Sequence, residues 1–277
     1  MAKKQQTQIM GILNITPDSF SDGGLYSKPQ LALKRAEAML REGADIIDIG
    51  GESTRPGAHS VPADEEIKRV VPVIKLIRAK LGKKVRISID TNKAAVAEAA
   101  LAAGANMVNS LGGFTFDKKL AKVVAKAHCP IVIYHIKGEP RTMQSGAIRY
   151  KNVVAEINSF FKNEMIVGKR AGIKKEQFIL DPGIGFGKSV EHNLEIVKNF
   201  KAFTKWKLPL LIGASRKSHL AMVLQKKMNL KNLPAPEERI EAGLAEAGVA
   251  VLAGATIVRT HDVLATKKFL AILDSVR

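Results

Sequence analysis

The feature that most constrains the fold is a chain-long alternation of short apolar runs with longer helical stretches. The runs lack the apolar–polar alternation of strands that face water on one side, so they are typical of parallel strands buried on both faces. Eight such strands with helices between them favour a closed (β/α)8 barrel, with a doubly wound open sheet as the alternative. The runs are Ile9–Leu13, Asp45–Ile49, Val85–Ile89, Asn106–Val108, Ile131–Tyr134, Phe178–Leu180, Leu208–Ile212 and Thr256–Val258.

Glycines mark the predicted ends of four helices, each shortly before a strand. They are Gly43, Gly104, Gly172 and Gly254, and glycine is the usual residue just beyond a helix C-terminus. At three of them the next residue is alanine, a repeated joint that lets a helix end and a strand start approach closely. No linker divides the 277 residues, so we predict a single α/β domain over 1–277. The segment Asn229–Pro236 is expected to separate two helices between the last two strands.

Charge and cysteine content narrow the classes of function. The net charge of +18 is compatible with nucleic acid, an anionic membrane surface or small acidic substrates. The lysines fall largely in helical stretches, where a solvated face is the simpler interpretation. Three Tyr and one Trp give little to stack on bases.

The lone Cys129 excludes an intrachain disulfide and is interpreted as a buried structural thiol. No run is long enough for a signal-peptide core or a membrane span, so a cytoplasmic protein without membrane or nucleic-acid partners is expected.

Polar side chains follow every one of the eight predicted strands. In a barrel the C-terminal strand ends converge on one rim, where the active site lies. Any single polar strand end is explained by a loop, but eight together predict a functional rim. The residues are Asn14, Asp48 with Glu52, Asp90, Asn109, His135 with Lys137, Asp181, Ser215 with Lys217, and Arg259 with His261.

Two kinds of subsite are suggested by these residue types. The Asp181 carboxylate can accept a pair of N–H groups from an aminopyrimidine edge, although Asp-Pro-Gly is also a turn signal. The segment Ser215–Ser218 follows a strand and opens a helix, a setting that suits an anion, and Arg259–Asp262 ends the last strand, where barrels often bind phosphate. There is no G-x-S-x-G elbow, H-E-x-x-H motif or cysteine pair, which argues against a serine triad or a tight transition-metal site.

Two long segments resemble the signatures of dihydropteroate synthases. They are Gly11–Gly24 (GILNITPDSFSDGG) and Asp48–Ala58 (DIGGESTRPGA). The resemblance extends from about Ile9 to the last helix, and it implies a transferase that joins 6-hydroxymethyl-7,8-dihydropterin pyrophosphate to 4-aminobenzoate and releases pyrophosphate. Shorter matches follow in order at Ser88–Thr91, Lys137–Gln144, Asp181–Lys188, Ser215–Ser218 and Arg259–Val263.

The resemblance also implies roles for individual residues. The pterin ring would be held by Asp90, Asn109, Asp181 and Lys217, and Asn14, Arg259 and His261 would receive the pyrophosphate, with Mg2+ bridging to Asn14. Loops carrying Phe20 and Thr54-Arg55-Pro56 would form the aminobenzoate pocket with Lys217 and Ser218, and Phe186 and Gly213 complete the expected substrate-binding positions. The candidate catalytic residues are Asp90, Asp181, Lys217, Arg259 and His261. Homodimerisation and competition by sulfonamides are further expectations from the resemblance.

Three positions depart from the family pattern. Ser110 stands where relatives usually have an acidic residue, and Tyr134 and Ile136 replace common methionines beside His135. Ser110 leaves open a paralogue that binds pterin without turnover, and Tyr134 and Ile136 suggest a pterin-facing wall of different shape. A pterin-binding methyltransferase barrel and a basic nucleic-acid-binding protein are two competing hypotheses. The methyltransferase needs neither aminobenzoate loops nor a pyrophosphate site, and the nucleic-acid protein needs a basic stripe with interleaved aromatics.

Overall fold

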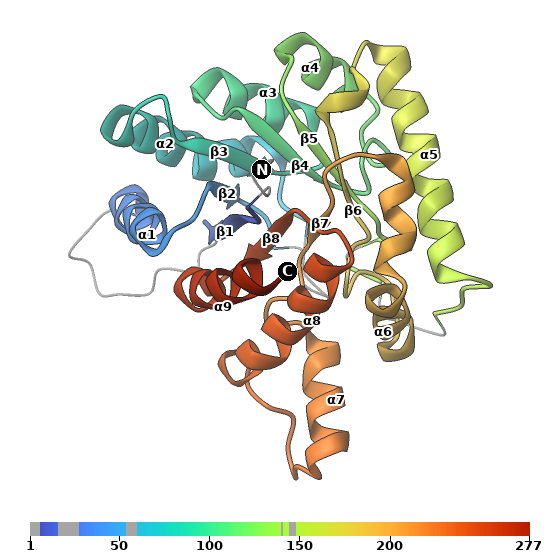
Figure 1. Cartoon of the computed structure of the whole chain (residues 1–277). Helices are drawn as coiled ribbons and strands as arrows, with labels where there is room; N and C mark the ends of the chain where they lie inside the picture. The colour runs from blue at the N-terminus through green and yellow to red at the C-terminus, as the bar shows by residue number, and fades with distance from the viewer. Residues whose placement is uncertain (1–5, 16–27, 54–59, 140, 144–147) are drawn as a thin grey trace.

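A computed structural model describes residues 6–15, 28–53, 60–139, 141–143 and 148–277. Eight parallel strands form one sheet in the order β6-β5-β4-β3-β2-β1-β8-β7. Figure 1 shows them at the centre of a ring of helices. The strands are β1 (Gln8–Asn14), β2 (Ile46–Gly50), β3 (Arg86–Asp90), β4 (Met107–Leu111), β5 (Ile131–Tyr134), β6 (Phe178–Asp181), β7 (Leu211–Ile212) and β8 (Ile257–Thr260).

The sheet closes between β6 and β7 through one isolated parallel bridge, Leu180 to Leu210. The Leu180 N–H donates to the Pro209 carbonyl at 3.0 Å. The predicted (β/α)8 barrel is therefore confirmed, and the open doubly wound sheet is not formed. Strand β7 is shorter than the predicted run Leu208–Ile212, because its first residues contribute this bridge rather than a continuous ladder.

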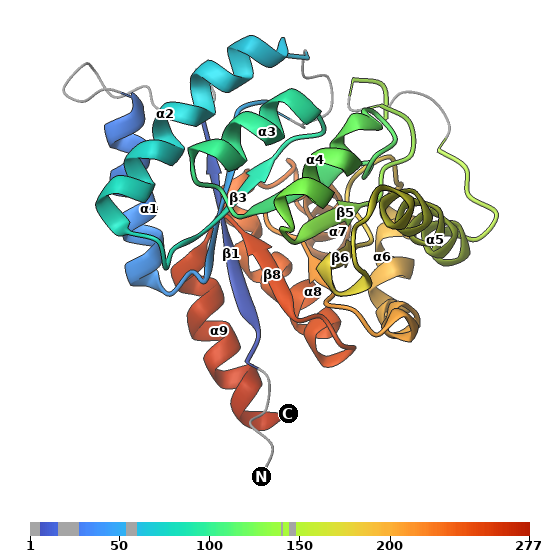
Figure 2. The ribbon, with the colours of Figure 1, turned by 90° about the horizontal axis from the view of Figure 1, so that it is seen from above.

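Helices cover the outside of the strands in chain order. Figure 1 shows α7 standing out from the ring next to α8, and Figure 2 shows α9 beside the start of β1, where both ends of the chain lie. The helices are α1 (Lys28–Glu42), α2 (Ala63–Leu81), α3 (Ala94–Ala103), α4 (Lys119–Ala127), α5 (Val153–Ala171), α6 (Val190–Lys198), α7 (Ser218–Met228), α8 (Ile240–Leu252) and α9 (Val263–Val276), with 3-10 turns at Lys175–Gln177, Phe200–Trp206 and Pro236–Arg239.

The four predicted helix stops lie at helix ends and adopt the left-handed backbone conformation that favours glycine. Their φ angles are 104° at Gly43, 116° at Gly104, 103° at Gly172 and 115° at Gly254. At each joint the following N–H reaches back to a carbonyl five residues earlier, as from Ala105 to Ala100 at 2.9 Å. This closes the helix end and directs the chain into the next strand.

The lower part of the barrel interior is sealed by apolar side chains. Seven strands each contribute one buried residue to this floor, which comprises Met10, Ile46, Met107, Val132, Ile179, Leu211 and Ile257. Two residues further along β2 and β4, on the same inward-facing side, polar side chains begin, at Asp48 and Asn109. The polar rim therefore rests on a dry floor, which is the condition for strong electrostatic interactions above it.

The structure also bears on the predictions for Cys129 and for the segment Asn229–Pro236. Cys129 is buried, and burial raises the pKa of its thiol to about 11, so the structural interpretation of this cysteine is confirmed. The segment Asn229–Pro236 lies between α7 and α8, as expected. Within the described ranges, every helix is too short or too polar to span a bilayer.

Candidate active site

Arg259 on β8 joins two buried aspartates at the centre of the rim. Its Nε donates to Asp48 Oδ2 at 2.7 Å and its Nη2 to Asp90 Oδ2 at 2.6 Å. The Asp48 side chain is fully buried and that of Asp90 is 10% exposed. Burial lowers the pKa of Arg259, but the two carboxylates outweigh it and raise that pKa. The guanidinium is therefore a permanent cation that holds β2, β3 and β8 together at the mouth of the barrel.

The network extends to β4 and β5. Asn109 Nδ2 donates to Asp48 Oδ2 at 2.9 Å, and the Tyr134 hydroxyl donates to Asp90 Oδ1 at 2.9 Å. Two further oxygens of the network, Asp48 Oδ1 and Asn109 Oδ1, are buried without a hydrogen-bond partner among the described residues. Because buried polar atoms normally have partners, a pair of orphan acceptors at this depth indicates a place for a ligand with N–H donors.

A cavity that is partly open to solvent, with about 250 Å³ of empty space in all, lies beside this network. Asp181 lies at its β6 side, where Oδ1 accepts from the Gly183 N–H at 2.7 Å. Asp181 Oδ2 lies 3.9 Å from where a Cβ on Gly213 would be, so this oxygen faces the cavity. The expected turn contact is thus present on one oxygen, and the other oxygen lies beside Gly213, which also lines the cavity. The lining residues are Asn109, Tyr134, Asp181, Ile184, Phe186, Gly213, Lys217 and Arg259.

Lys217 and Phe186 form the outer wall of the cavity. The Lys217 ammonium lies 3.8 Å from the centre of the Phe186 ring, a cation–π contact. The Phe186 ring packs in turn on Tyr134, with 5.4 Å between ring centres. A flat heterocycle in this cavity would have an aromatic wall, a cation and carboxylates around its edge.

Burial shifts the pKa of each charged group around the cavity. It raises the pKa of Asp90 to about 7, against the lowering effect of Arg259, and the pKa of Asp181 to about 6. Burial together with Arg259 lowers the pKa of Lys217 to about 8, although Asp181 acts in the opposite direction. Perturbed carboxyl and amine groups that share one cleft are a physical mark of a functional site.

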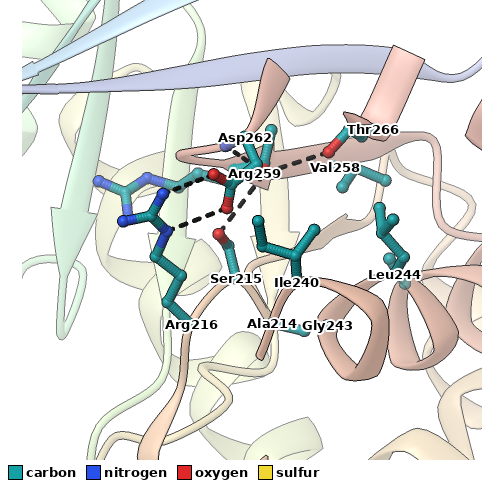
Figure 3. A pocket seen from close by; sticks show the side chains of 12 residues that line it. Ala214, Ser215, Arg216, Ile240, Gly243, Leu244, Val258, Arg259, Asp262 and Thr266 are labelled. Atoms are coloured by element: carbon teal, nitrogen blue, oxygen red, sulfur yellow. Dashed lines mark hydrogen bonds and ion pairs between the residues drawn. The ribbon is translucent and has the colours of Figure 1, made fainter. Parts of the chain in front are cut away.

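The turn before α7 fixes the direction of Lys217. Arg216 has φ 58°, a strained conformation for a residue with a side chain. Its guanidinium pairs with Asp262 through Nε–Oδ2 at 3.0 Å and Nη2–Oδ1 at 2.6 Å, and its carbonyl accepts from Arg239 at 3.1 Å. Figure 3 shows this pair beside a second hollow of about 300 Å³, whose apolar side is formed by residues of α8. The ion pair joins the turn to the start of α9 and so positions the N-terminus of α7.

His261 lies next to this turn and is held by Ser215. The Ser215 hydroxyl is 3.1 Å from His261 Nδ1 and accepts from the His261 N–H at 3.2 Å. Burial, with Arg259 and Arg216 nearby, lowers the pKa of His261 to about 3. With Nδ1 accepting from the serine, a neutral His261 carries its proton on Nε2 and can donate it to an anion.

Asn14 ends β1 on the same rim, and its Oδ1 lies 3.6 Å from where a Cβ on Gly50 would be. Within the described part of the chain, there is no group of three or more His, Cys, Asp or Glu that could hold a metal ion. The Asn14 side chain offers an amide oxygen, a type of ligand that suits Mg2+ where phosphate and water supply most of the others.

The structure brings half of the predicted site residues together. Asn109, Asp181, Phe186, Gly213, Lys217 and Arg259 line the cavity, and Asp90 is bonded to two of its lining residues. Asn14, Ser218 and His261 lie at strand ends or at the start of α7, outside the lining. Phe20, Thr54, Arg55 and Pro56 lie outside the described residues.

Three polar strand ends do not reach this cavity. The Glu52 carboxylate pairs with Lys93, which also donates to Glu66 of α2 at 2.6 Å. His135 is buried under the neighbouring loop, and Lys137 pairs with Glu156 at 2.9 Å. These three residues follow strands as predicted, but their side chains contact neighbouring helices and loops and do not line the cavity.

The departure at Ser110 lies away from the cavity. Residues alternate along a strand, so Asn109 faces inward and Ser110 faces the helices. The buried Ser110 hydroxyl donates to the Gly113 carbonyl at 2.7 Å. Glu164 of α5 supplies a buried carboxylate to the same turn, accepting from the Phe114 N–H at 2.6 Å. Ser110 therefore bears on a turn and not on substrate binding.

Sequence reasoning misses the contributions of Asp48 and Tyr134. The sequence places Asp48 at a strand end, but nothing in it shows that Arg259 reaches this carboxylate across the barrel. Tyr134 stands out in the sequence only as a departure from the family, and its register pairing with Asp181 places it on the inner wall.

Comparison with known proteins assigns this arrangement to a family. The model of the family described as "Pterin binding enzyme" matches residues 10–261. The chain is 44% identical to the dihydropteroate synthase of Clostridium beijerinckii, covering 98% of this chain and 94% of the relative. It is 42% identical to that of Synechocystis sp., covering 98% and 90%.

Solved structures agree with the sequence relatives. The Xanthomonas albilineans dihydropteroate synthase with 4-aminobenzoic acid has a TM-score of 0.88 at 36% identity, covering 98% of this chain and 93% of that one. The Yersinia pestis enzyme in complex with a sulfonamide drug has a TM-score of 0.88 at 39% identity, covering 98% and 94%. This chain therefore belongs to the dihydropteroate synthase family of pterin-binding enzymes.

Proposed function

We propose that this chain is a transferase that condenses 6-hydroxymethyl-7,8-dihydropterin pyrophosphate with 4-aminobenzoate, giving 7,8-dihydropteroate and pyrophosphate for folate biosynthesis. The observation that carries the proposal is the pair of buried, unpartnered oxygens of the described residues, Asp48 Oδ1 and Asn109 Oδ1, beneath a cavity edged by Asp181 and Lys217. A pterin has N–H donors for these acceptors and a flat ring for the Phe186 wall. Relatives that match over nearly the whole chain are named as synthases, which favours this activity over a methyltransferase.

The pterin is oriented by complementary groups at its edges. Asp181 Oδ2 accepts from the aminopyrimidine N–H groups, and the Lys217 ammonium donates to a ring acceptor. Asp90 and Asn109 complete the recognition on the inner side. A site built from placed donors and acceptors discriminates strongly against rings that lack the matching groups, because its buried polar atoms would be left unpaired.

The diphosphate is received at the rim by Arg259, neutral His261 and Asn14. Asn14 supplies an amide oxygen that suits Mg2+, and when bound the cation neutralises the departing diphosphate. The aminobenzoate lies beside Ser218 and Lys217, together with Phe20, Thr54, Arg55 and Pro56. Sulfonamides then act as competitors for this subsite.

The reaction proceeds with departure of the diphosphate before attack. The bond between the exocyclic methylene carbon and the diphosphate oxygen breaks, and its electron pair leaves with the oxygen. The arylamine nitrogen then bonds to the methylene carbon and loses a proton. Abundant anion-binding groups, and the absence of an activated nucleophile among the described rim residues, support this order, since Arg259 and His261 stabilise charge that develops on the leaving group.

The test is pyrophosphate release with pterin pyrophosphate, Mg2+ and 4-aminobenzoate, with the product identified by mass. Release that depends on aminobenzoate, yields dihydropteroate and collapses in Lys217→Ala supports the proposal. No product from protein that binds pterin by calorimetry would identify a silent paralogue or a methyltransferase. Positional isotope exchange in the diphosphate tests the order of steps, because a dissociative reaction scrambles the bridging oxygen when cleavage is reversible.

The chain is further proposed to act as a homodimer through the surface of α7, α8 and α9. Nine of the twelve exposed large apolar side chains of the described residues lie between Met222 and Val276, and clustered apolar exposure is typical of a protein interface. Light scattering should give twice the chain mass, and Met222→Asp with Leu252→Asp should give a monomer.

A cytoplasmic location is proposed from the unpaired thiol of Cys129, and fractionation would test it.

A further inference from the structure

We propose that Lys188, a residue outside the cavity lining, is a positioning residue that fixes the pterin-facing loop after β6 before substrate binds. This inference rests on the proposed pterin site. The loop runs from Pro182 to Ser189 and joins β6 to α6. It follows Asp181 and carries Phe186, so its shape sets one edge and one wall of the cavity.

The Lys188 side chain is 2% exposed and lies between two loops. Its Nζ is 2.8 Å from the Gly183 carbonyl, 3.0 Å from the Phe186 carbonyl and 2.9 Å from His135 Nδ1. A longer contact of 3.4 Å reaches the His135 carbonyl. The three short contacts match the hydrogen-bonding capacity of one amino group. One side chain therefore holds two points of the β6 loop against the loop that follows β5.

The two loops pack backbone against backbone. A Cβ on Gly183 would lie 1.8 Å from the His135 carbonyl oxygen, and one on Gly187 would lie 2.1 Å from the Lys137 carbonyl oxygen. The backbones are thus in direct contact at both ends of the turn. A turn of glycines has high conformational entropy when free, and the amino group between the two contacts is placed to hold it in one shape.

The fixed loop positions two pterin-facing groups, the Asp181 carboxylate and the Phe186 ring. The Gly183 N–H that orients Asp181 Oδ1 belongs to a residue whose carbonyl Lys188 holds. The Phe186 carbonyl is held on the other side, which presents the Phe186 ring to Lys217 and Tyr134. Removing the Lys188 amino group releases the Gly183 carbonyl and the Phe186 carbonyl at the same time. Because aminobenzoate is not proposed to contact this loop and meets it only indirectly, through Lys217 on Phe186, the loss should fall mainly on pterin.

The first test is Lys188→Met, which keeps the length of the side chain and removes the donors. The matched control is Ile196→Ala, at a fully buried residue of α6 that belongs to neither loop and whose truncation should lower stability. We expect the Kd for 6-hydroxymethyl-7,8-dihydropterin to rise at least tenfold in Lys188→Met, with the KM for pterin pyrophosphate rising in parallel. The KM for aminobenzoate should stay within twofold of wild type, and Ile196→Ala should leave all three constants within twofold.

Equal pterin affinity in wild type and folded Lys188→Met would overturn the proposal, as would an equal loss of affinity for pterin and aminobenzoate. If wild-type protein itself binds no pterin, the proposed function fails instead, so the two failures are distinguishable.

The second test uses wild-type protein and does not depend on a variant that folds. Hydrogen exchange is followed at the Gly183, Gly185 and Phe186 amides without ligand and with saturating dihydropterin. A loop held in advance by Lys188 should be protected without ligand, with less than a threefold further slowing on binding. Fast exchange that becomes protected only with pterin would show that the ligand, not Lys188, orders the loop, and would refute the proposal.

Discussion

The Tyr134 hydroxyl donates to Asp90 Oδ1 at 2.9 Å while Arg259 holds Oδ2 of the same carboxylate at 2.6 Å. Asp90 is thus bound on both oxygens, by a neutral donor and by a cation. Both bonds favour the ionised carboxylate and oppose the burial that raises its pKa to about 7.

This relationship predicts the effect of Tyr134→Phe. The pKa of Asp90 should rise further, so that less carboxylate is ionised at pH 7. Dihydropterin affinity should then fall by roughly threefold to tenfold, which corresponds to the net contribution of about 1 kcal/mol of a typical hydrogen bond. The difference in dihydropterin affinity between wild type and Tyr134→Phe should shrink as pH rises, because Asp90 then ionises in both proteins. Calorimetry between pH 6 and pH 9 measures this difference in affinity. A deficit that is constant with pH would contradict the argument.

Asp181→Asn is predicted to stabilise the ligand-free protein and to abolish pterin binding. The folded pKa of Asp181 is about 6, above an unfolded value of about 3.9. The cost of burying its charge therefore appears as pH rises from about 4 and is complete above the folded pKa. Urea unfolding at pH 8 should give a gain of about 1–3 kcal/mol that disappears near pH 4. The exposed Asp64→Asn should show no such trend, and a loss of stability at pH 8 would count against the assignment.

Pyrophosphate should raise the pKa of His261 from its ligand-free value of about 3. The free imidazole is neutral at pH 7, and an anion beside it favours the protonated ring. By linkage, pyrophosphate affinity should increase as pH falls toward the bound-state pKa. Histidine-selective NMR with and without pyrophosphate measures the shift, with the exposed His128 as internal reference. An unmoved His261 resonance would remove this residue from the anion site.

Lys93→Met is predicted to destabilise the fold by about 3–5 kcal/mol, because it leaves buried charge without its counterion. Lys93 Nζ contacts both Glu52 and Glu66, and the Glu66 side chain is 1% exposed. Adding Glu66→Gln should restore part of the loss, and a double-mutant cycle in urea measures the coupling. Additive effects of the two substitutions would show that the pair is not coupled.

The sequence predicted those parts of the fold that depend on local pattern. Strand positions followed from apolar runs, and the helix ends at Gly43 and Gly104 from the need for a left-handed residue. The polar ends of β3, β4, β6 and β8 were placed correctly on the rim, because parallel strands in a barrel share a direction.

Features that depend on ring closure could not be predicted in this way. Arg259 reaches Asp48 only because β8 pairs with β1, which pairs with β2. Lys188 follows a glycine turn, where a lysine is ordinarily solvated, and its burial depends on the loop of another strand. The contacts of His135 with Lys188 and of Glu52 with Lys93 could not be predicted either, because the direction of a side chain just beyond a strand is set by what packs against it.

The single bridge between Leu180 and Leu210 means that a ligand in the neighbouring cavity can help to hold the barrel closed. The cavity straddles this seam, with Asp181 on the β6 side and Gly213 and Lys217 on the β7 side. A ligand that contacts both Asp181 and Lys217, as proposed for the pterin, would link the two sides of this seam, where a single bridge joins β6 to β7. Ligands that contact both sides of the seam should slow its opening. They should therefore protect the whole barrel from proteolysis more than ligands that contact only one side.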